Sequence, residues 1–125
     1  MKGKFNCEHR TFQNNDPIFI AKIQAIEIEI GDELTANDMC RCPDCNLAVG
    51  GEKHSAHMIE SNSNHLSCAG DFQVDAVSLP KIMDAARKHG ITRFGILRKS
   101  GQNGYVHMDI GSQGDGFEQN RIWTY

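Results

Sequence analysis

Long apolar runs, clusters of basic residues and evenly spread cysteine pairs are all missing from this sequence. No apolar stretch approaches the ~20 consecutive residues that a membrane-spanning helix requires, so no membrane span is expected. Lys and Arg occur at most as adjacent pairs and the formal net charge is -3, which argues against a protein that binds nucleic acid through its phosphates. Residues 1–7 are polar where a secretory signal has an apolar run, so synthesis in the cytoplasm without a signal peptide is expected.

The five cysteines are an odd number and do not resemble the framework of a small disulfide-rich domain. Cys40, Cys42 and Cys45 crowd into six residues. Together with Cys7 or His9 they offer enough soft ligands for a structural zinc, although the second CxxC of a strong zinc motif is missing. Thiols packed in a loop, or a pair between Cys7 and Cys42, are the alternatives, and the sequence leaves the choice open.

The length and composition indicate an ordinary globular protein. With 125 residues, 39% of them hydrophobic and 23% charged, the chain is long enough to bury a core of its own. We therefore expect one domain over residues 1–125. Nothing in the composition indicates an oligomeric state.

Two helices and three strands are predicted. Asp16 and Pro17 form a good helix start, apolar residues then recur at helical spacing, and Gly31 ends the run. A second helix is predicted between Ser78 and Gly90.

Alternating residues predict strands over 71–75, 93–97 and 105–110, with a turn-rich segment 99–104 between the last two. These elements favour an α+β fold: a small, mainly antiparallel sheet with two or three helices. A long irregular segment, 37–69, is typical of a functional loop.

The strand over 105–110 separates its side chains into an apolar and a polar face. Even-numbered residues are apolar and are expected in the core. The opposite face carries Tyr105, His107 and Asp109. Asp71 lies on the polar face of its own strand, so Asp71 and His107 meet if the two polar faces adjoin.

A catalytic zinc takes three protein ligands and keeps a fourth position open. Asp71 and His107 would supply two of them. The third is expected from the irregular segment before Asp71, which contains His54, His57 and His65. A histidine on a strand is also common without any metal, and spacing alone does not decide between the two interpretations.

At this point the sequence resembles a family. The run from Arg41 to Gly51, followed by Ser55-Ala56-His57, is similar to the loop Arg-x-Pro-x-x-Asn-x-x-Val-Gly-Gly…Ser-x-His of the M15 peptidases. These include the zinc D-Ala-D-Ala carboxypeptidases, whose subfamily A the pattern resembles, and phage L-Ala-D-Glu endolysins. Further similar segments are 69–71, 106–111 and 121–125.

The resemblance implies the hedgehog/D-Ala-D-Ala peptidase fold, a Zn²⁺ cofactor and hydrolysis of peptide bonds in peptidoglycan stem peptides. The action would be that of a carboxypeptidase or a murein endopeptidase at the cell wall, as in phage lytic enzymes. Two alternatives remain: a catalytically degenerate wall-binding or virion-associated module of the same fold, and a small zinc-ribbon interaction protein built on the cysteines.

By the resemblance, the zinc ligands are the histidine of the Ser-x-His element, Asp71 and His107. In the family the histidine lies seven residues before the aspartate, whereas His57 lies 14 and His65 six residues before Asp71. His65 is preferred because a short chelate loop loses little entropy on closing. His57 is the alternative, and the other histidine would then lie on the loop over the cleft.

Two further residues receive roles from the resemblance. Many relatives have a catalytic carboxylate three residues before the final histidine, where this chain has Gly104. Asp109 is then the nearest candidate for the general base, or alternatively holds His107 in position. Arg41 is expected to stabilise the oxyanion or to hold a substrate carboxylate. Trp123 is expected to close the core.

Overall fold

The two predicted helices are confirmed. The computed structural model describes residues 1–99 and 102–125. Helix α1 (Pro17–Ile30) begins after Asp16, whose carboxylate accepts a hydrogen bond of 2.8 Å from the Ile18 N–H, and ends at Gly31 with φ +69°. Helix α3 spans Ser78–Lys88, and the short helix α2 spans Pro43–Ala48. Of the helices in the described ranges, none is both long enough and apolar enough to cross a bilayer.

The described residues contain one sheet of six strands. In chain order these are β1 (Lys2–Gly3), β2 (Thr35–Asp38), β3 (Ala69–Val74), β4 (Arg93–Lys99), β5 (Gln102–Asp109) and β6 (Arg121–Thr124). Their order across the sheet is β1-β2-β3-β5-β4-β6, with antiparallel pairing except between β1 and β2 and between β4 and β6. The predicted mainly antiparallel α+β fold is confirmed. The middle of the predicted turn over 99–104 lies outside the described residues.

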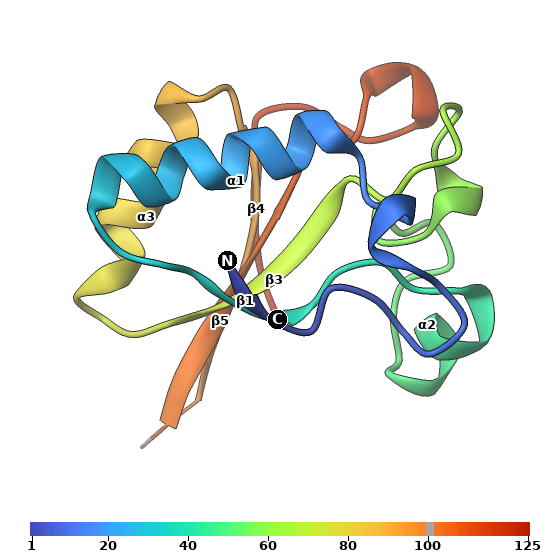
Figure 1. Cartoon of the computed structure of the whole chain (residues 1–125), viewed down its shortest axis with the longest axis horizontal. Helices are drawn as coiled ribbons and strands as arrows, with labels where there is room; N and C mark the ends of the chain where they lie inside the picture. The colour runs from blue at the N-terminus through green and yellow to red at the C-terminus, as the bar shows by residue number, and fades with distance from the viewer. Residues whose placement is uncertain (100–101) are drawn as a thin grey trace.

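The sheet has one apolar and one polar face, as the alternation in β5 predicts. Val106 and Met108 are fully buried in the same core as Phe19 of α1 and Ile82 of α3. Figure 1 shows α1 and α3 lying together against the sheet. Because alternate residues point to opposite faces, the residues between these core positions, including His107, face away from the helices. That second face is therefore free to carry a site.

The irregular segment 37–69 folds back on itself beside the sheet. The Cys68 N–H donates to the Ala56 carbonyl at 3.1 Å, and the Arg41 N–H donates to the His57 carbonyl at 3.0 Å. These hydrogen bonds fix the segment at the edge of the polar face, where α2 also lies (Figure 1). The segment thus forms one wall over the polar face rather than a loose loop.

Candidate metal centre

A row of paired residues crosses the polar face of the sheet. Asp71 of β3 lies opposite His107 of β5, His107 lies opposite Gly95 of β4, and Gly95 lies opposite Trp123 of β6. Directly opposite side chains are about 5 Å apart at Cβ, so an aspartate and a histidine in such a pair can touch. The prediction that the polar faces of these two strands adjoin is confirmed.

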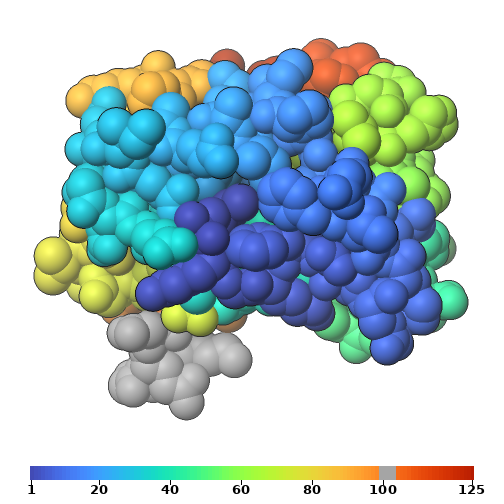
Figure 2. Space-filling view, in the orientation of Figure 1, coloured from blue at the N-terminus to red at the C-terminus, as the bar shows by residue number. Residues whose placement is uncertain are grey.

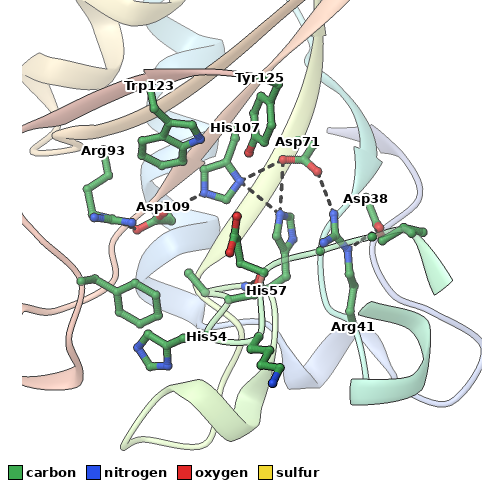
Figure 3. Close-up of a pocket in the computed structure, with 18 of the residues that line it drawn as sticks. Asp38, Arg41, His54, His57, Asp71, Arg93, His107, Asp109, Trp123 and Tyr125 are labelled. Carbon is green, nitrogen blue, oxygen red and sulfur yellow. Dashed lines mark hydrogen bonds and ion pairs between the residues drawn. The ribbon is translucent and has the colours of Figure 1, made fainter. Parts of the chain in front are cut away.

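His57 completes a compact triangle of donor atoms with Asp71 and His107 (Figure 3). Asp71 Oδ1 lies 2.9 Å from His107 Nδ1 and 3.3 Å from His57 Nε2. The two ring nitrogens are 3.2 Å apart. All three residues are buried, and none is more than 6% exposed.

The triangle has the size that a zinc ion requires. Tetrahedral ligands at about 2.1 Å from zinc are about 3.4 Å from one another. The three observed separations, 2.9, 3.2 and 3.3 Å, are close to this value. Two imidazoles and one carboxylate are also a ligand set that zinc accepts, with a fourth position left for water or substrate. The residues therefore fit a catalytic zinc.

The other nitrogen of each histidine has an acceptor of its own. His57 Nδ1 donates to the Met39 carbonyl at 2.6 Å, and His107 Nε2 donates to Asp109 Oδ2 at 2.7 Å. With this nitrogen committed to its acceptor, the nitrogen that faces the triangle is the one available to a metal. Such partners fix the tautomer and the ring orientation of metal-binding histidines.

His65, which the sequence analysis preferred to His57 as a ligand, lies outside this group. His65 is exposed and has a left-handed backbone, with φ +56°. The preference assumed that the shorter chain segment closes more easily. The loop between the two histidines is instead closed by its own hydrogen bonds, with the Asn62 amide donating to the carbonyls of Ala56 and Met58 at 3.3 and 3.0 Å. His57 is therefore held beside Asp71 despite its distance in sequence.

Both carboxylate oxygens of Asp109 accept hydrogen bonds, one of them from His107 of the triangle. Its Oδ2 accepts from His107, while Oδ1 accepts from Arg93 Nε at 2.7 Å and from the Gly111 N–H at 2.8 Å. Burial raises the pKa of Asp109, but the hydrogen bond from His107 and the charge of Arg93 hold it below the usual range. A buried carboxylate with a low pKa and no free oxygen is a poor proton acceptor. The geometry favours the positioning role over the general base.

The charges of the triangle are strongly coupled. Burial lowers the pKa of His107, but hydrogen bonds to Asp109 and Asp71 raise it to about 9. Burial raises the pKa of Asp71, but the charge of His57 and the hydrogen bond from His107 bring it well below the usual range. Without a metal, the Asp71 carboxylate is therefore ionised and both nitrogens of the His107 ring are protonated. The positive charge of this imidazolium then stands where a metal cation would otherwise lie.

A comparison with known families agrees with this geometry. The sequence profile described as Peptidase M15 matches residues 2–109. The chain belongs to the peptidase M15 family. None of the curated protein sequences matches it. The matched region contains His57, Asp71 and His107, and membership together with this group supports a zinc peptidase-like function.

This M15 chain has no room for a carboxylate at position 104. A Cβ on Gly104 would lie 1.8 Å from the Leu97 carbonyl oxygen, so a side chain cannot be accommodated without moving β4. The cleft is lined by two exposed carboxylates that the sequence analysis did not single out, Glu52 and Glu118. Neither side chain takes part in a hydrogen bond or ion pair among the described residues. Both are free to accept a proton.

Arg41 lies beside the triangle and holds three oxygen atoms. Its Nε donates to Asp38 Oδ2 at 2.6 Å, one terminal nitrogen donates to Asp71 Oδ2 at 3.0 Å and the other to Asn46 Oδ1 at 3.1 Å. A guanidinium carries five N–H groups, so two remain for a ligand. Arg41 therefore orients Asp71 and can still bind an anionic oxygen in the cleft that it lines.

The triangle opens into a cleft of about 1110 Å³. Trp123, which was expected to close the core, lines this cleft instead, with its ring centroid 5.3 Å from that of His107. The indole reaches this position by lying over Gly95, where a Cβ would come within 2.5 Å of it. His54 also lines the cleft and stacks on Phe117 with centroids 4.3 Å apart.

Proposed function

We propose that this chain is a zinc-dependent peptidase that hydrolyses peptide bonds in peptidoglycan stem peptides, with His57, Asp71 and His107 holding the zinc. The observation that carries the proposal is the triangle formed by His57 Nε2, Asp71 Oδ1 and His107 Nδ1, which has the dimensions of a zinc site and faces an open cleft. Metal-assisted hydrolysis is the chemistry that fits two imidazoles and a carboxylate with a free fourth position.

Residues around the triangle have separate tasks in the reaction. Zinc, when bound, polarises the scissile carbonyl and makes a water acidic enough to attack near neutral pH. Asp109 holds His107 in the required tautomer. The two free N–H groups of Arg41 stabilise the negative charge that develops on the carbonyl oxygen, a task to which a preorganised donor in a cleft contributes strongly.

Proton transfer is assigned to the exposed carboxylates of the cleft. Asp38, Asp71 and Asp109 are each occupied by a guanidinium or an imidazole. Glu52 and Glu118 line the same cleft and have no such partner among the described residues. One of them accepts the proton from water and returns it to the leaving amine. Glu52→Gln and Glu118→Gln, tested separately, identify which one.

Two exposed cations of the cleft can bind carboxylates of a peptide substrate. Lys53 and Arg121 are exposed in the lining, and neither forms an ion pair within the described ranges. Stem peptides of peptidoglycan carry free carboxylates along the chain and at the D-alanine end, which these cations can bind. Aromatic rings of Tyr105, Trp123 and Tyr125 add an apolar wall. The proposed place of action is accordingly the cell wall, where a phage lytic or virion protein also acts.

The test is digestion of purified peptidoglycan, followed by mass spectrometry of the soluble products. The wild type is expected to release stem-peptide fragments or free D-alanine, to stop in the presence of a chelator, and to recover on addition of zinc. His57→Ala is expected to be inactive and His65→Ala active. A protein that binds peptidoglycan but releases no product with zinc present would be the degenerate module instead, and the proposed function would be wrong.

A further inference from the structure

A second group of metal-binding side chains lies apart from the triangle. Cys7, His9, Cys42 and Cys45 each offer one donor atom, and these four atoms lie within 4.8 Å of one another. The cysteines are free thiols. We propose that this cysteine cluster binds a second zinc ion that has a structural role. The proposal does not depend on the peptidase activity.

The distances around His9 are those of a tetrahedral site. With zinc at about 2.3 Å from sulfur and about 2.0 to 2.1 Å from nitrogen, a sulfur and a nitrogen ligand are about 3.6 Å apart. His9 Nδ1 lies 3.4 Å from Cys42 Sγ and 3.5 Å from Cys45 Sγ. Three thiolates and one imidazole are a common ligand set of structural zinc.

The backbone around the cysteines is arranged to hold thiolates. The Cys45 N–H points at Cys42 Sγ at 3.4 Å, and the Cys42 N–H points at Cys7 Sγ at 3.4 Å. Hydrogen bonds of this kind favour the charged form of a sulfur, which is the form that binds metal. They also hold the Cys42-Pro43-Asp44-Cys45 turn in the shape that directs both of its sulfurs to one point.

A backbone hydrogen bond holds the segment 7–9 next to the 42–45 turn. The Cys7 N–H donates to the Cys40 carbonyl at 2.9 Å, so Cys7 reaches the cluster from a segment more than 30 residues away in sequence. Figures 1 and 2 show the N-terminal segment running beside the segment that carries α2. The second nitrogen of His9, Nε2, lies 3.5 Å from Glu8 Oε1, and both side chains are exposed.

A closed set of four protein ligands leaves no position for substrate, which is the mark of a structural rather than a catalytic zinc. The ion would join residues 7–9 to the start of α2. Arg41 lies between Cys40 and Cys42, so the same ion would fix the segment that carries Arg41 into the cleft. Binding displaces the thiol protons, so it requires no oxidant.

The first experiment is metal analysis of the full chain purified with zinc. The wild type is expected to hold two zinc ions per chain and His107→Ala one. Cys45→Ser is also expected to hold one, because a serine oxygen replaces a sulfur ligand of the cluster. Cys40→Ala is the matched control from the same sequence run, since its buried side chain lies outside the cluster, and it is expected to keep two.

Cobalt(II) loading separates the two sites by their spectra. Only a site with sulfur ligands gives a near-ultraviolet thiolate-to-metal charge-transfer band. This band is expected in the wild type and in His107→Ala, and is expected to weaken strongly in Cys45→Ser. A His107→Ala protein that takes up no metal and shows no such band would overturn the proposal while leaving the peptidase function untouched.

A measurement on the wild type covers the case in which Cys45→Ser does not fold. Cys45 is the least buried cysteine of the cluster, so it can be alkylated in the folded protein. Zinc is expected to slow its alkylation at least about tenfold, as followed by peptide mass mapping. An equal alkylation rate with and without zinc would contradict the second site.

Discussion

The two groups of side chains proposed to bind metal in this M15 chain differ in how completely they would surround a cation. The triangle of His57, Asp71 and His107 offers three buried donors and opens into the cleft. The cysteine cluster offers four donors near the surface, with His9 exposed and Cys45 half-buried. An open position permits a metal to act on substrate, whereas a closed shell only holds the chain together. The same fold thus provides one site suited to chemistry and one suited to stability.

The two groups also differ in the structural elements that carry their residues. The triangle depends on strand register, with Asp71 directly opposite His107, and only His57 comes from a loop. The cysteine cluster combines residues 7–9, outside any helix or strand, with the start of α2, which contains Cys45. Arg41 connects them, because it follows Cys40, precedes Cys42 and donates to Asp71. Because the two groups share no ligand, variants on either side should have separable effects on metal content.

The largest effect is expected from His107→Ala. Loss of this ligand should reduce peptidoglycan hydrolysis on the order of 10³-fold or more, because the zinc that activates water is no longer held. The cysteine cluster should keep its metal. Hydrolysis rate and zinc content are measured on the same preparation, and hydrolysis that persists at more than about a tenth of the wild-type rate would contradict the site.

Arg41→Lys is expected to lower kcat about 100-fold while the zinc content stays unchanged. A lysine keeps the charge but cannot bind Asp38, Asp71 and Asn46 and still offer two donors to the oxyanion. Steady-state kinetics on a synthetic stem peptide separate kcat from KM. An unchanged kcat with a raised KM would mean that Arg41 holds a substrate carboxylate and does not stabilise the oxyanion.

Asp109→Asn is expected to weaken zinc binding at the triangle by about 10- to 100-fold, as loss of a ligand's hydrogen-bond partner commonly does. Activity at saturating zinc should recover most of the wild-type rate if Asp109 only positions His107. Competition with a coloured chelator gives the affinity. Activity that stays below a hundredth of the wild-type rate at saturating zinc would assign Asp109 to proton transfer instead.

Zinc affinity of the triangle is expected to rise with pH. The pKa of His107 in the metal-free protein is raised to about 9, so at neutral pH zinc must displace its proton. Affinity should increase by up to ~tenfold per pH unit for each proton displaced and level off above the pKa of His107. Titration calorimetry in buffers of different ionisation enthalpy counts the released protons, and a pH-independent affinity below pH ~8 would contradict this coupling.

The smallest effect is expected from His65→Ala. This exposed histidine lies outside the triangle, so zinc content and hydrolysis should match the wild type within about twofold. The variant is the matched control for His57→Ala. A loss of zinc in His65→Ala with full zinc in His57→Ala would restore the choice that the sequence favoured.

Much of the scaffold could be predicted because its signals are local. Asp16-Pro17 and Gly31 bound α1, and alternation in 105–110 separates core from site face correctly. The short strands β1, β2 and β6 were missed, since two to four residues show no period. Helix α2 falls inside the segment predicted as irregular.

The parts of the site that sequence reasoning left open or placed elsewhere depend on contacts between distant segments. His57 reaches Asp71 because hydrogen bonds close the loop that follows it, which residue counting cannot reveal. Asp109 is fixed by Arg93, its partner in the β4–β5 register, and this pair needs the register to be known. Trp123 reaches the cleft because Gly95 leaves room for it.

A zinc-edge anomalous difference map from a crystal of the protein grown with zinc tests the central claim most directly. We predict a strong peak at about 2.1 Å from each of His57 Nε2, Asp71 Oδ1 and His107 Nδ1. A map with no peak between these three atoms, or with a peak bound by His65, would contradict the proposed centre.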